Sequence, residues 1–135
     1  MITALICVAS SAAVIQFVYY CRSALASVNG VELSAHALGV AGLKGGRLAP
    51  GDFQRFLELV RLCPEQRAER AGIRAVAVYY KLLCTVDRAS HLLIPALSAW
   101  AKREQQSCSH FAAVVLDRRI SSSRELLLQH AADRS

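Results

Sequence analysis

The first 21 residues, MITALICVASSAAVIQFVYYC, contain no Asp, Glu, Lys, Arg or His, and 17 of them are apolar. A helix of this length extends about 31 Å, which is close to the hydrocarbon thickness of a bilayer. A small globular chain offers few partners that would cover such a helix on all sides. The sequence therefore predicts a membrane anchor over residues 1–22, represented by Met1, Leu5, Val14, Phe17, Tyr19, Tyr20 and Arg22.

The carboxyl end of this stretch has the residue order of a helix that leaves a membrane. Tyr19 and Tyr20 are amphipathic side chains typical of the headgroup level, and the charged Arg22 follows them. In the middle of the stretch, small side chains permit a second helix to approach closely in lipid. The candidate packing residues of the span are Ala9, Ser10, Ala12 and Ala13.

Two other interpretations of residues 1–21 stay open. One is the core helix of a soluble protein, and the other is a cleaved signal peptide. Ala24 and Ala26 precede Ser27 in an order that resembles the small-residue cleavage pattern. However, no basic residue precedes the apolar run, and the run is longer than the hydrophobic core of most signal peptides. We therefore favour an uncleaved anchor.

The placement of basic residues predicts the orientation of the chain, because they accumulate on the side that is not translocated. None precedes the apolar stretch, whereas Arg22, Lys44, Arg47 and Arg55 follow it. We expect the N-terminus outside and the C-terminal domain in the cytoplasm. Arg supplies 13 of the 16 basic residues, a bias typical of a high-GC genome. A bacterial inner membrane is the expected location, and a mitochondrial inner membrane is the alternative.

Residues 23–51 are predicted to be a connector rich in Gly and Ala. Six of the seven glycines of the chain fall in this segment, and their close spacing disfavours a long helix. Ser34 is placed to cap a short helix over residues 35–43, which Gly45 would end.

Residues 52–135 are predicted to form a soluble helical domain. The first helix begins at Pro50, carries Asp52 near its positively polarised end and stops before Pro64. The predicted core face of this helix consists of Phe53, Phe56, Leu57, Leu59, Val60, Leu62 and Cys63.

Two longer helices follow, one from about residue 65 to residues 87–89 and one from Pro95 to about Ile120. Ser122 and Glu125 then match a capping box, which indicates either a new short helix or a kinked continuation. The predicted fold class is all-α, with a single N-terminal transmembrane helix followed by a small soluble helical bundle of three to four helices.

Glu104 interrupts the apolar stripe of the third helix, and an isolated buried carboxylate would be costly. It would pair with an arginine of the second helix or with a partner protein. The alternative, which the pattern slightly favours, places Glu104 at the rim of the bundle.

The sequence contains no constellation that indicates catalysis or metal binding. Its five cysteines and four histidines lack the spacing of zinc, haem or redox motifs. Cys63 and Cys84 fall on apolar stripes, where a thiol packs like a small hydrophobic group. Cys108 and His110 are two positions apart on a helix, so their side chains point about 200 degrees apart. We predict no enzymatic activity, no metal, no cofactor and reduced cysteines.

The net charge of +6 does not by itself indicate nucleic-acid binding. The basic residues are interleaved with acids, and Arg118 and Arg119 are the only two adjacent arginines. No recognition helix or aromatic platform accompanies them. The expected partners are membrane lipid and protein subunits, with no nucleic acid and no evident small-molecule substrate.

These features together favour a non-catalytic accessory or scaffold subunit of a larger membrane protein complex. A membrane-tethered regulator of a soluble protein is the alternative, followed by an electron-transfer subunit with a cofactor. Aromatic and arginine side chains are favoured anchors at protein interfaces. The candidate partner contacts are Arg67, Arg70, Arg74, Trp100, Glu104, Phe111, Arg118 and Arg119.

Overall fold

The computed structural model describes residues 1–31, 49–64, 67–91 and 93–134. The order of elements is α1 (Ile2–Ala26), the 3-10 turn η1 (Pro50–Asp52), α3 (Phe53–Leu62), α4 (Arg67–Ser90) and α5 (Pro95–Ala132). Within these ranges every regular element is helical, which confirms the all-α prediction. The predicted short helix over residues 35–43 lies outside the described residues.

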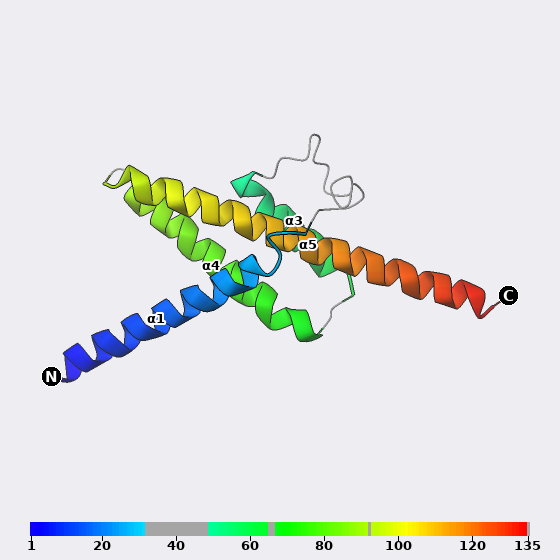
Figure 1. Ribbon diagram of the computed structural model, residues 1–135, viewed down its shortest axis with the longest axis horizontal. Helices are drawn as coiled ribbons and strands as arrows, with labels where there is room; N and C mark the ends of the chain where they lie inside the picture. The colour runs from blue at the N-terminus through cyan, green and yellow to red at the C-terminus, as the bar shows by residue number, and fades with distance from the viewer. Residues whose placement is uncertain (32–48, 65–66, 92, 135) are drawn as a thin grey trace.

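The bundle is built around a hairpin of α4 and α5, which share the most extensive contact in the structure. The helix α3 packs along α5, and α1 reaches α4 and α5 only with its carboxyl end (Figure 1). At the turn of the hairpin, the Ser98 hydroxyl donates a hydrogen bond to the Asp87 carboxylate and so joins the two helices. The result is a small helical body from which α1 and the end of α5 project in opposite directions (Figure 1).

Pro50 and Asp52 lie at the entry into α3, as the sequence predicts. The backbone N–H of Ala49 donates to Asp52 Oδ2 over 2.8 Å, and this bond closes the turn that leads into the helix. Phe53, Phe56 and Val60 are buried, as the spacing predicts. Leu62 is 83% exposed, so its predicted place on the core face was wrong. The reason is geometric, because Leu62 is turned about 200 degrees away from Val60 on the helix.

The centre of the core lies between α3, α4 and α5. The rings of Phe53 and Tyr80 stack with centroids 4.3 Å apart. Tyr79, the residue before Tyr80 on α4, is also fully buried. From α5, the core receives mostly small side chains, which let the helices approach closely, and these include Ala101, Cys108, Ala112, Ala113 and Val115.

The helix α5 is continuous over 38 residues, so the capping box at Ser122 starts no new helix. The Ser122 hydroxyl instead donates to the carbonyl of Arg118 over 2.9 Å, a bond made within a continuing helix. All residues from Arg124 to Arg134 are exposed. The end of α5 therefore extends beyond the bundle.

The helix α1 joins the apolar stretch to the bundle without a break. It runs to Ala26, so residues 23–26 of the predicted connector are helical. Residues 1–16 are exposed all round, whereas Cys21 and Leu25 are buried in the core. Cys21 Sγ contacts the carbonyl oxygen of Ala75 on α4 at 3.8 Å. The carboxyl end of α1 is thus a structural part of the helical body.

Candidate functional site

The exposed part of α1 carries more exposed large apolar residues than any other described helix. The helix is long and apolar enough to cross a membrane, as the sequence predicts. Of the predicted anchor residues, Met1, Leu5, Val14, Tyr19 and Tyr20 are exposed on this part, and Arg22 follows it. Phe17 is half-buried and packs against the bundle core, so the apolar stretch contacts the bundle before it ends.

The small residues predicted for helix packing all lie on the exposed part of α1, and they are Ala9, Ser10, Ala12 and Ala13. Between them, the hydroxyl of Ser11 donates to the carbonyl of Cys7 over 2.7 Å. This bond satisfies the hydroxyl within its own helix, which is what an apolar solvent requires of a polar group.

Glu104 connects α1 to the bundle and does not lie at the rim, where the sequence pattern slightly favoured it. Its side chain is only 14% exposed, and Oε1 lies 3.5 Å from Nε of Arg22. The hydroxyl of Tyr79 donates to Oε2 over 3.2 Å. The arginine that pairs with Glu104 therefore comes from α1 and not from the second predicted helix. Burial, together with the charge of Glu104, raises the pKa of Tyr79.

Cys108 lies in the core below this junction and is fully buried. Burial and then the charge of Glu104 raise the pKa of its thiol to about 12. Since the thiolate is the reactive form, Cys108 is protonated and unreactive at neutral pH. All five cysteines are free, and no group of three or more metal-ligating side chains converges within the described ranges.

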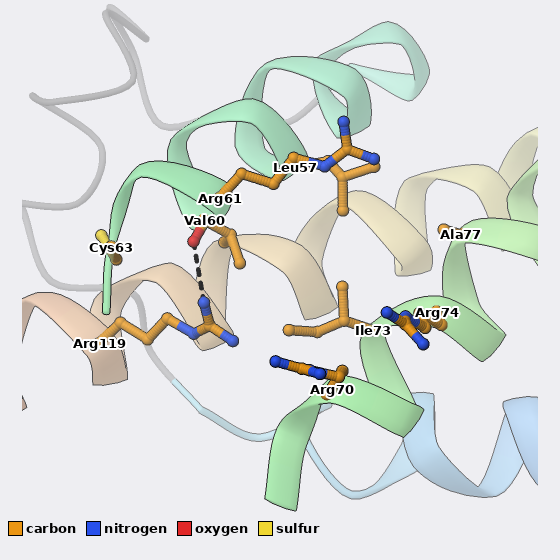
Figure 2. A pocket seen from close by; sticks show the side chains of 9 residues that line it. All are labelled: Leu57, Val60, Arg61, Cys63, Arg70, Ile73, Arg74, Ala77 and Arg119. Carbon is orange, nitrogen blue, oxygen red and sulfur yellow. Dashed lines mark hydrogen bonds between the residues drawn. The ribbon is translucent and has the colours of Figure 1, made fainter. Parts of the chain in front are cut away.

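A cavity of about 390 Å³ opens between α3, α4 and α5. Figure 2 shows its arginines projecting around a floor of aliphatic side chains. The residues that line it are Leu57, Val60, Arg61, Cys63, Arg70, Ile73, Arg74, Ala77 and Arg119. Arg61, Arg70 and Arg74 are exposed to solvent at the mouth of this basic cavity.

Arg119 lies at the inner wall of the basic cavity and is 3% exposed. Its Nη1 donates to the carbonyl of Val60 over 2.9 Å (Figure 2). Its Nε lies 3.4 Å from Oε2 of Glu69. This position corrects its place among the partner contacts, because the guanidinium is committed to bonds inside the protein. The sequence did carry a signal, since Arg119 is four residues after Val115 and three after Leu116 on the buried stripe.

The other candidate partner contacts do not form one surface. Arg70 and Arg74 line the basic cavity, whereas Arg67 and Arg118 are exposed outside it. Trp100 and Phe111 are partly buried and pack against the core, so each presents only part of its ring to a partner.

The projecting end of α5 is an exposed apolar surface that the sequence analysis did not single out. Leu126, Leu127 and Leu128 are 58%, 72% and 63% exposed, respectively. Three consecutive leucines on a helix cover about 200 degrees of its circumference, so they form a local patch and not a core stripe.

The chain matches no family model, no curated protein and no solved structure.

Proposed function

We propose that this chain is a non-catalytic single-pass membrane protein that serves as an accessory or scaffold subunit of a larger membrane protein complex. The observation that carries this proposal is the pair of exposed apolar surfaces at opposite ends of the molecule (Figure 1). One is the exposed part of α1, and the other is the leucine patch at residues 126–128. Exposed apolar patches of this kind mark contacts with proteins or membranes.

The two surfaces suit different surroundings. The exposed part of α1 has no charged residue and is suited to lipid, with its small side chains open to a second transmembrane helix. The leucine patch on α5 is bordered by Arg124 and Glu125, so it is suited to a protein partner at the aqueous side. A chain that meets lipid at one end and protein at the other is well placed to join subunits.

The orientation belongs to the same proposal. Arg22 follows the apolar stretch, and the other basic residues come after it in the chain. This asymmetry supports an N-terminus outside and a cytoplasmic bundle in a bacterial inner membrane. Proteolysis of sealed right-side-out vesicles is expected to leave residues 65–135 intact, and cleavage of the bundle would contradict this orientation.

The test is a native pull-down of the full chain from membranes solubilised in a mild detergent. Stable membrane subunits are expected to co-purify in fixed proportion. Leu127→Asp removes an exposed leucine and adds a charge, so it is expected to release partners held by α5. Gln129→Asp introduces the same side chain nearby on an exposed polar position and serves as the matched control.

Three outcomes distinguish the functional classes. Membrane subunits in fixed proportion support the accessory role. Soluble partners in small and variable amounts indicate a membrane-tethered regulator, which would replace the proposal. A monodisperse chain without partners would contradict it.

A further inference from the structure

The basic cavity combines charged and apolar walls. Four arginines, from three different helices, surround it, and its floor is formed by Leu57, Val60, Ile73 and Ala77. Its volume of about 390 Å³ falls within the range of about 300–1,000 Å³ that is typical of small-molecule sites. The cavity therefore has room for a charged group together with part of an apolar body.

The charges around the cavity are mainly of one sign. Arg119 approaches from α5 and Arg70 from α4, and Figure 2 shows their guanidinium groups directed toward the same space beside Ile73. Glu69 pairs with Nε of Arg119, and Arg70 also makes an interaction within the protein. Both groups are therefore held in place. Arg61 and Arg74 add two more positive charges at the mouth.

Arg61 and Arg74 lie exposed at the mouth, and an anion between two positive charges is attracted by both. The planar guanidinium group matches the oxygens of a phosphate with paired hydrogen bonds. We propose that the basic cavity binds the phosphate group of an anionic amphiphile, with Arg61 and Arg74 at the mouth on the phosphate and the aliphatic floor against the apolar part. This site is independent of the proposed subunit role.

The position of the cavity makes a lipid headgroup a reachable source of this phosphate. Cys21, near the end of the apolar stretch, contacts α4 at the carbonyl of Ala75. Ile73 and Ala77 lie on the opposite face of α4 and line the cavity. One helix diameter, about 10 Å, therefore separates the cavity from the point at which α1 would leave a bilayer. A soluble phosphate ester carries the same chemistry.

Native mass spectrometry of the full chain, released from a neutral detergent, tests the proposal. The lipid probe is phosphatidic acid, the soluble probe is glycerol 3-phosphate, and phosphatidylcholine is the zwitterionic control. We expect one phosphatidic acid per chain, displaced by excess glycerol 3-phosphate. Glycerol 3-phosphate that binds as tightly as the lipid would identify a soluble ester as the ligand.

Variants at the mouth separate a built site from general charge attraction. The double variant Arg61→Gln and Arg74→Gln is expected to weaken binding at least about tenfold. The double variant Arg67→Gln and Arg118→Gln removes the same charge outside the cavity and is expected to bind as the unaltered chain does. All four residues are exposed, so these changes leave the core intact.

Three results would overturn the proposal. These are equal loss of binding in the two double variants, equal binding of phosphatidylcholine and phosphatidic acid, and binding of neither phosphate probe. Should the cavity variant fail to fold, the comparison of phosphatidic acid with phosphatidylcholine on the unaltered chain still decides, because equal binding of the two lipids would mean that the site does not select an anionic headgroup.

Discussion

The helices α1 and α5 are both long, and each is partly buried in the bundle and partly exposed, but their exposed parts differ in kind. The exposed part of α1 is uncharged on every side, whereas the exposed end of α5 carries its three leucines among Arg and Glu. Water solvates the charged residues at the end of α5, whereas exposure of the apolar part of α1 to water is unfavourable over its whole length. The comparison teaches that exposure alone does not identify a partner, since the chemistry around the exposed apolar residues decides between lipid and protein.

The largest effect is expected from charges in the exposed part of α1. Changing Val8 and Val14 to Asp together would raise the cost of membrane insertion by about 5–7 kcal/mol, because each charge near the centre of a span costs about 2.5–3.5 kcal/mol. The chain is then expected to leave the membrane fraction on alkaline extraction. The matched double change of Leu126 and Leu127 to Asp is expected to leave the chain in the membrane fraction. Loss from the membrane in both variants would mean that the exposed parts of α1 and α5 do not differ in their role in membrane binding.

The next effect concerns the buried end of α1. Leu25 is 3% exposed, and Leu25→Ala is expected to lower the free energy of unfolding by about 2–5 kcal/mol through the lost contacts and the cavity left behind. Leu126 is 58% exposed, and Leu126→Ala is expected to change the free energy of unfolding by no more than about 0.5 kcal/mol. Denaturant unfolding in detergent measures both. Equal values would mean that α1 is not part of the helical body.

A pH dependence is expected from the buried part of α5. The folded chain raises the pKa of Cys108 from 9.0 to about 12, so it holds this proton more tightly than the unfolded chain does. The resulting stabilisation is fully present below pH 9 and is lost as the pH rises towards 12. Burial also raises the pKa of Tyr80 to about 12, in the same direction.

The melting temperature is therefore expected to fall steeply between pH 9 and pH 12. Cys108→Ala should make this fall shallower, because it removes the thiol share. Cys7→Ala, in the exposed part of α1, should leave the profile unchanged. The same profile in Cys108→Ala as in the unaltered chain would mean that the Cys108 thiol does not contribute to the pH dependence of stability.

The smallest effect is expected where the two helices meet through charge. Arg22 is 59% exposed in its pair with Glu104, so Arg22→Gln is expected to cost only about 0.2–1 kcal/mol, and less at high salt. Arg118→Gln, on an exposed position outside the cavity, is the control. A loss well above this range, insensitive to salt, would mean that the junction depends on Arg22 for more than ion pairing.

Much of the fold could be predicted because its signals are local. The spacing of Phe53, Phe56 and Val60 specifies one buried face, and Pro64 ends the helix in any context. Ser122 shows the opposite case. Its capping motif is local too, but a helix that is already formed keeps the hydroxyl on the carbonyl of Arg118.

The candidate sites divide in the same way. The apolar surface of α1 was predictable because one uninterrupted stretch supplies it. The basic cavity was not, because Arg61, Arg74 and Arg119 lie on three helices, and only their packing brings them together. The buried position of Arg119 had a signal in its spacing from Val115, but the adjacent Arg118 made the pair look like a surface charge.

The all-α class and a first helix long and apolar enough to cross a membrane follow from the amino-acid sequence alone, because composition and period act within one segment. The pairing of Glu104 with Arg22, the burial of Arg119 and the cavity among the arginines follow only from the packing of the helices. The physical reason is that pairing and burial depend on which faces of different helices meet. The register between helices is set by the fit of the whole core and is not written in any one helix.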